Sequence, residues 1–331
     1  MRELKESVEM PLSINALMRH LRNTANISIA GSRQKQLLRS MGYYHGYKGY
    51  RFMGAATNRI PFSDFDQVAA LYEFDMRMKT LIYPEVMFIE TALKSYVLEA
   101  VLEDAGSEDF NVIFSRSMTA YREVAGTKRY GDELRMRLRA RDEINRILYN
   151  NCDSKRGDPV IWHFLEPGKP VPIWAIFEEL TLGQFGSFYL ALGSRVKNAV
   201  AHQLDLPRSV DGGKVVGDMI FMLRLLRNAV AHNKPIYDCR FRSRKPGGAL
   251  IACLQTGTGI NGITFDQITD FVILMAYLLR KMGKSKTECR RFANGYLKLV
   301  SEYWKTLPGN TAARIAGTDV TKKINAMIGS M

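Results

Sequence analysis

The residues best suited to do chemistry are Arg227, Asn228 and His232, which lie within six consecutive positions. In a helix, Asn228 and His232 are four residues apart and share a face, and the long side chain of Arg227 can reach that face. An imidazole exchanges protons near neutral pH, and a guanidinium is always charged and pairs with phosphate oxygens two at a time. Together these residue types can break a phosphodiester bond without a metal ion.

The residues that follow the histidine extend this pattern. Asn233 and Lys234 come directly after it, before Pro235, and we predict that both contact the nucleic acid. The segment 197–202 repeats the motif, but Lys197 replaces the arginine. Lysine lacks the planar fork that clamps phosphate, so we predict that this second copy has no catalytic role.

The charge of the chain favours an anionic partner. The sequence has 47 Lys and Arg against 33 Asp and Glu, a formal net charge of +14. Nucleic acid is the first expectation from such a balance, although solubility alone also selects for basic proteins.

Two segments are candidates for contacting that partner. Tyr43 and Tyr44 lie among glycines and basic residues, as in a surface that stacks bases, and the alternative is that they pack a turn against neighbouring helices. Arg135 and Arg139 belong to six arginines between positions 129 and 146, which form either a phosphate-binding rim or an ordinary solvated helix.

The elements that must position these residues are helical. Apolar residues recur at helical spacing through most of the chain, and no stretch alternates convincingly as a strand does. We predict an all-α protein with a long connection over 152–172 and a weakly packed helix or tail over 312–331. The predicted helices start or run over residues 14–21, 35–41, 63–97, 121–146, 173–183 and 265–282, with Ser13, Ser63 and Thr264 as caps and Pro84 as an interruption. A further helix contains Arg227 and follows a break at 211–213.

Several other classes of site are excluded by the motifs that the sequence lacks. Its four cysteines are scattered, without metal-ligand spacing or a disulfide pattern, and His20, His45 and His163 have no neighbouring ligands. Phosphate-binding loops, zinc-protease motifs and nucleophile elbows are absent, so we predict no metal and no cofactor. The segment 1–6 resembles no signal peptide and no stretch is apolar enough to span a membrane, which predicts a cytoplasmic protein without membrane contact.

Beyond the motif, several stretches resemble the Abi-like (AbiD/AbiF) abortive-infection family, which belongs to the helical HEPN nuclease superfamily. The matching stretches, in the family's order, are Met10 to Ile14, Met41 to Tyr47, Leu71 to Asp75 with Ile89 and Glu90, Pro172 to Trp174 with Glu178, Leu180, Thr181 and Gly183, and Leu226 to Asn228 with Ala231 to Asn233. Lys79 and Lys94 differ from the arginines expected at their positions, which keeps the charge but removes the fork-like hydrogen bonding.

The resemblance implies a HEPN-like helical bundle with additional N-terminal and inserted helices, which cleaves RNA as part of a toxin-type defence against phage. Arg227, Asn228 and His232 are the catalytic residues that it implies, and Asp75, Glu90, Trp174 and Glu178 would support them. It also implies a homodimer in which two motifs face one cleft, restrained by a small structured RNA. The expected parts are an N-terminal helical segment over 1–62, the HEPN-like domain over 63–300 and a tail or helix over 301–331.

Two other functions remain open at this point. The same fold can hold a structured RNA or a protein partner without cutting it, with Arg227 and His232 as contacts. A DNA-binding regulator is the weaker alternative, because no helix-turn-helix pattern stands out.

Overall fold

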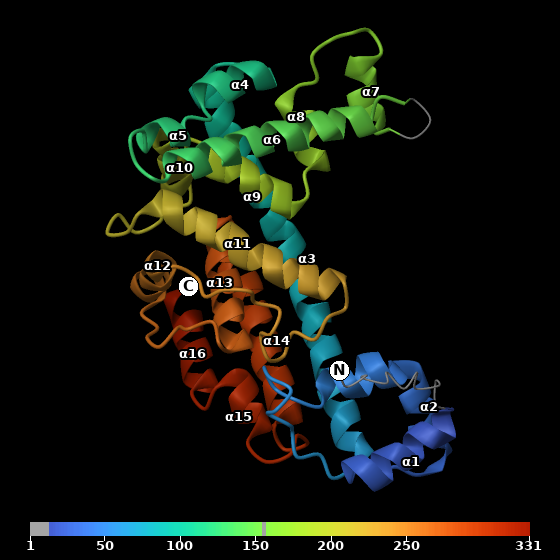
Figure 1. The fold of residues 1–331 in the computed structure, drawn as a ribbon. Helices are drawn as coiled ribbons and strands as arrows, with labels where there is room; N and C mark the ends of the chain where they lie inside the picture. The colour runs from blue at the N-terminus through green and yellow to red at the C-terminus, as the bar shows by residue number, and fades with distance from the viewer. Residues whose placement is uncertain (1–12, 154–156) are drawn as a thin grey trace, which may run out of the picture.

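The computed structural model describes residues 13–153 and 157–331, and over these residues the chain is helical, which confirms the all-α prediction (Figure 1). Within them the backbone forms three isolated β-bridges and no sheet. Met1 to Leu12, which include the predicted non-signal segment and Met10 to Leu12 of the family resemblance, lie outside the described residues.

Helix α3, Phe65–Ala105, is the central element (Figure 1). Its 41 residues extend about 60 Å, and they contact helices from both halves of the chain. The helix begins one residue later than predicted, because Asp64 rather than Ser63 caps it, in a capping box with Gln67. Pro84 lies inside the helix, which continues through it instead of stopping there.

The N-terminal helices pack around the first half of α3. Ser13 caps α1 as predicted, accepting a hydrogen bond from the backbone of Ala16 at 3.3 Å. The tyrosine-rich segment is a π-helix that continues directly from α2. These elements are α1 (Ile14–Ala25), α2 (Gly31–Met41) and η1 (Gly42–Lys48).

Seven helices surround the second half of α3, at the top of Figure 1. They are α4 (Phe110–Arg116), α5 (Ala120–Glu123), α6 (Tyr130–Asn150), α7 (Pro159–Leu165), α8 (Ile173–Glu179), α9 (Leu182–Ala191) and α10 (Ser194–Gln203).

Three boundaries in this region differ from the prediction. The helix expected over 121–146 is split into α5 and α6, and the predicted connection contains α7, whose first turn is capped by Asp158. The helix expected over 173–183 ends at Glu179, because Thr181 and Gln184 form a capping box that starts α9.

The C-terminal helices are α11 (Gly212–Ala231), α12 (Gly248–Thr258), α13 (Ile268–Lys281), α14 (Lys286–Trp304), α15 (Thr311–Ala316) and α16 (Val320–Ser330). Helix α13 begins three residues after the predicted start at Phe265, since that residue has a left-handed backbone (φ 61°) and Thr264 does not cap the helix. The segment expected to be a weakly packed helix or tail is helical, but the weak packing is wrong. Ile324 of α16 is fully buried, and Lys323 forms a buried ion pair with Asp270 at 3.3 Å.

One continuous apolar core includes residues from α1 to α16. Among the helices within residues 13–153 and 157–331, none combines the length and the apolar character that crossing a bilayer requires.

Candidate functional site

The predicted motif lies at the C-terminal end of α11. Arg227 and Asn228 occupy the last turns, and His232 is the residue that caps the helix end. Leu226 and Val230 face the core and are buried, whereas Asn228 and His232 are exposed. The helix therefore holds its apolar side against the protein and presents the amide and the imidazole to solvent on the other side.

The end of α11 is defined by the residue after the histidine. Asn233 has a left-handed backbone (φ 51°), its N–H donates to the carbonyl of Val230 at 3.0 Å, and the N–H of Lys234 donates to Ala229 at 2.8 Å. These two bonds form a Schellman motif, for which asparagine is the commonest residue after glycine. The helix stop fixes the backbone on the C-terminal side of His232.

Arg227 is held from the central helix. Its Nε donates a hydrogen bond to Oε2 of Glu90 at 3.2 Å, and the Glu90 side chain is 8% exposed against 28% for Arg227. Glu90 also lies 4.0 Å from Nζ of Lys94, which donates to the carbonyl of Leu180 at 2.6 Å. The arginine is thus anchored by one nitrogen to a buried carboxylate.

Lys94 belongs to the same charge cluster, between α3 and the start of α9. Burial lowers the pKa of its ammonium group, and the carboxylates of Glu90 and Glu178 oppose that shift. Glu178 is exposed on α8 and reaches the site through this long-range interaction with Lys94.

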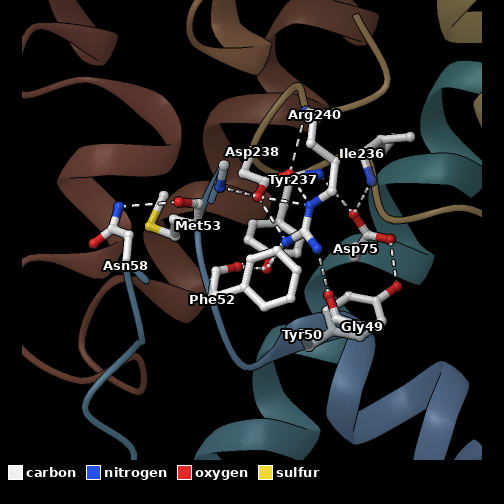
Figure 2. A network of polar contacts seen from close by, with 11 residues as sticks. Gly49, Tyr50, Phe52, Met53, Asn58, Asp75, Ile236, Tyr237, Asp238 and Arg240 are labelled. Atoms are coloured by element: carbon white, nitrogen blue, oxygen red, sulfur yellow. Dashed lines mark hydrogen bonds and ion pairs between the residues drawn. The ribbon is translucent and has the colours of Figure 1, made fainter. Parts of the chain in front are cut away.

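Asp75 holds the segment that follows the motif (Figure 2). Its Oδ1 accepts hydrogen bonds from the backbone N–H groups of Ile236 and Tyr237, at 2.9 and 2.8 Å, and its Oδ2 accepts from the hydroxyl of Tyr50 at 2.7 Å. Burial, with the Asp75 charge, raises the pKa of Tyr50, so this hydroxyl keeps its proton and donates.

Lys79 connects Asp75 to the end of α11. Its Nζ lies 2.8 Å from Oδ2 of Asp75 and donates to Oδ1 of Asn233 at 2.8 Å, and the Lys79 side chain is 6% exposed. The residue next to His232 is therefore bonded to α3 through a buried ammonium group.

Arg240 extends this network to the N-terminal part of the chain (Figure 2). Its guanidinium pairs with Asp238 and donates to the carbonyls of Gly49 and Phe52 at 2.9 and 2.7 Å. Tyr237 also donates to Phe52, at 2.6 Å. We did not predict Tyr50, Tyr237, Asp238 or Arg240 as part of the site. Asp238 and Arg240 are near neighbours in the sequence, but the bonds that join this group to Asp75, Gly49 and Phe52 span distant parts of the chain.

Other predicted residues lie away from the motif. Trp174 donates from its indole nitrogen to Glu108 at 3.2 Å and packs against Phe164. Tyr43 is buried, whereas Tyr44 is 69% exposed, with Nζ of Lys48 4.8 Å from its ring centre.

Arg135 and Arg139 lie on α6, where each pairs with a carboxylate of the same helix. Their partners are Asp132 and Glu143, each at 3.0 Å. Along residues 13–153 and 157–331, no group of three or more histidine, cysteine, aspartate or glutamate side chains could hold a metal ion.

A comparison with protein-family models matches residues 36–238 to the family described as Abi-like protein. The match covers more than half of the chain and includes α3, α11 and the whole of the motif. The chain belongs to the Abi-like family. No curated protein and no solved structure matches it. The family resemblance predicted from the sequence is confirmed.

Proposed function

We propose that this Abi-like protein is a metal-independent RNA endonuclease of the HEPN type, in which Arg227, Asn228 and His232 carry the reaction. The strongest support is the arrangement of Arg227 and His232 at the C-terminal end of α11. Glu90 anchors Arg227 through Nε, and the two terminal nitrogens of Arg227 have no hydrogen-bond partner among the described residues, while His232 is exposed at the end of the same helix.

RNA supplies the nucleophile for this reaction. A base removes the proton of the 2′-hydroxyl, the oxygen attacks the adjacent phosphorus, and the bond to the 5′-oxygen breaks as an acid protonates that leaving oxygen. The products are a 2′,3′-cyclic phosphate and a 5′-hydroxyl. His232 provides the base or the acid, Arg227 stabilises the charge on the phosphorane oxygens, and Asn228 orients one of these two side chains.

The proton transfers favour a homodimer. One reaction requires a base and an acid, and each chain has a single copy of the motif with an arginine. Two chains that place their motifs in one cleft would supply two imidazoles. Light scattering of the purified protein tests this assembly, and a monomer with full activity would contradict it.

The decisive experiment compares three proteins on the same labelled RNA in the presence of EDTA. The wild type should produce 2′,3′-cyclic phosphate ends, and His232→Ala should reduce cleavage by about a thousandfold or more. His202→Ala is the matched control, because His202 is an exposed histidine in the repeated motif on α10. Cleavage that survives in His232→Ala, or that requires magnesium in the wild type, refutes the proposal.

The second candidate is a module that binds RNA, such as a small regulatory RNA, or a protein partner without cleavage. The exposed Tyr44 with its neighbouring Lys48 and the net charge of +14 favour RNA binding. Gel-shift binding that persists in His232→Ala and Arg227→Ala, together with an inactive wild type, would favour this function.

In a cell, the proposed activity would act in abortive infection, the role with which its family is associated. Expression of the wild type in the cytoplasm of a bacterium should arrest growth, and expression of His232→Ala should not. Equal toxicity of the two proteins would show that the growth arrest does not depend on the proposed chemistry.

A further inference from the structure

A cavity of about 800 Å³ lies between α5, α6, α9, α10 and the first three turns of α11. In Figure 1, α6, α9 and α10 lie together above α11, and contacts join α9 to both α6 and α11. Neither Arg227 nor His232 lines the cavity. Lys197 and Asn198, the first residues of the repeated motif, do line it.

The cavity contains three cations that form no ion pair with any described residue. Nζ of Lys197 donates to the carbonyl of Leu190 at 2.8 Å. Burial lowers the pKa of this ammonium group, and the charges of Glu133, Glu123 and Asp211 oppose that shift. Arg224 lies over the ring of Phe221, 5.0 Å from its centre, and makes no ion pair with any residue described. Lys214 is exposed at the start of α11 and is likewise unpaired there.

The carboxylates of the same cavity are already bonded. Glu123 accepts hydrogen bonds from the backbone and the hydroxyl of Ser194, at 2.6 and 2.5 Å. Glu133 pairs with Arg129 at 2.6 Å.

The other two carboxylates of the cavity, Asp211 and Asp218, accept hydrogen bonds from backbone N–H groups. Asp211 caps α11 through the N–H of Lys214 at 3.1 Å, and Asp218 accepts from Gly247 at 3.2 Å and lies 3.6 Å from Arg244. Six cations line the cavity against four carboxylates, so its lining has a net positive charge.

Two glycines bring α10 close enough to α11 to place Lys197 at the cavity. A Cβ atom at Gly213 would lie 2.8 Å from Cβ of Lys197, and one at Gly212 would lie 2.5 Å from Cβ of Ala201. Any larger residue would force the two helices apart. The close contact holds Cβ of Lys197 at the start of α11, while the ammonium group of Lys197 reaches the carbonyl of Leu190 at the end of α9.

We propose that this cavity is a second binding site, which takes the phosphate group of a nucleotide-sized ligand. Its volume lies in the range of small-molecule sites, and Lys197, Lys214 and Arg224 supply the charge that binds phosphate. The ligand is either a free nucleotide or one nucleotide of a bound RNA strand.

The position of Arg224 suits the second possible ligand, one nucleotide of a bound RNA strand. Arg224, Asn228 and His232 recur every four residues and so share a face of α11, with about 12 Å of helix axis between the first and the last. The site also gives Lys197 and Asn198 a role other than catalysis.

The experiment measures calorimetric binding of ATP, GTP, CTP and UTP, each alone, and of a short 2′-O-methyl oligoribonucleotide, which lacks the nucleophile and cannot be cut. Lys197→Gln should weaken binding by about tenfold or more, and the exposed Lys214→Gln by a smaller factor. Arg291→Gln is the matched control, because it removes one exposed positive charge on α14, outside the cavity. His232→Ala should bind the four triphosphates as the wild type does, because His232 does not line the cavity, which separates this site from the proposed catalytic one.

The two sources give different results. Binding of a triphosphate that weakens in Lys197→Gln and Lys214→Gln shows a free-nucleotide site. Binding of the oligoribonucleotide alone, weakened by the same changes, shows an RNA subsite. The proposal is overturned if no probe binds the wild type at about 1 mM, or if Lys214→Gln, which leaves the fold intact, and Lys197→Gln weaken binding no more than Arg291→Gln does.

Discussion

Arg227 and Glu90 are joined by a hydrogen bond of 3.2 Å between Nε and Oε2, which links the motif on α11 to the central helix α3. The bond uses Nε, the guanidinium nitrogen bonded to the side-chain stem, and the two terminal nitrogens could still bind a phosphate group. In the proposed reaction Glu90 would be a positioning residue, since it would act on RNA only through Arg227.

Replacing Glu90 by glutamine should therefore lower RNA cleavage by about tenfold, because the neutral amide holds the guanidinium less firmly. The effect should disappear in the Arg227→Ala background, so that the double-mutant cycle is strongly non-additive. Glu99→Gln, an exposed change on the same helix, is the matched control. Equal loss from Glu90→Gln with and without Arg227 would assign Glu90 a merely structural role.

Replacing Asp75 should strongly destabilise the fold. Asp75→Asn removes the carboxylate that pairs with the buried Lys79 and accepts three other hydrogen bonds, and we expect it to lower the free energy of unfolding by about 3–5 kcal/mol. Asp66→Asn is the control, since the Asp66–Arg33 pair is exposed and should contribute less than about 1 kcal/mol. Urea denaturation measures both, and similar losses would contradict the assigned importance of the buried pair.

Glu288 gives a prediction of pH dependence. Hydrogen bonds from the hydroxyl and backbone of Ser285, with Lys284 nearby, lower the pKa of Glu288 from 4.5 to about 2. Because the folded-state pKa is lowered, the stabilisation is fully present above pH 4.5 and is lost as the pH falls towards 2. The difference in Tm between wild type and Glu288→Gln should shrink over that range. Ser285 and Glu288 form a capping box at the start of α14, and a constant difference would show that this cap does not depend on the ionisation of Glu288.

Local sequence patterns were sufficient to predict the helical class, the long α3 and the motif on α11. The Thr181 and Gln184 capping box was also present in the sequence, but the apolar run before it suggested one uninterrupted helix. The helix break depends on two polar side chains bonding to the backbone, and hydrophobic periodicity does not detect that preference.

The network behind the motif could not be predicted in the same way. Asp75 and Ile236 are 161 residues apart, and their contact depends on how α3 and α11 cross. Asn233 was predicted as an RNA contact. The structure shows its amide oxygen bonded to Lys79 and its backbone ending the helix, and its contact with RNA stays a prediction. Trp174 belongs to the family pattern, but its contacts are with α7 and Glu108.

Two asparagines of the motif region should separate stability from catalysis. Asn233→Ala forces an alanine into the left-handed backbone region, where its Cβ atom is strained and its side chain cannot form the hydrogen bonds that asparagine forms. It also removes the contact with Lys79, so the free energy of unfolding should fall by about 2 kcal/mol or more. Asn233→Gly removes the contact but accepts the backbone, and should lose about 1–2 kcal/mol less than Asn233→Ala. Asn228→Ala changes an exposed helical position and should leave stability within about 0.5 kcal/mol while lowering RNA cleavage. If Asn233→Gly were as unstable as Asn233→Ala, the left-handed helix end would not be the reason that asparagine follows His232.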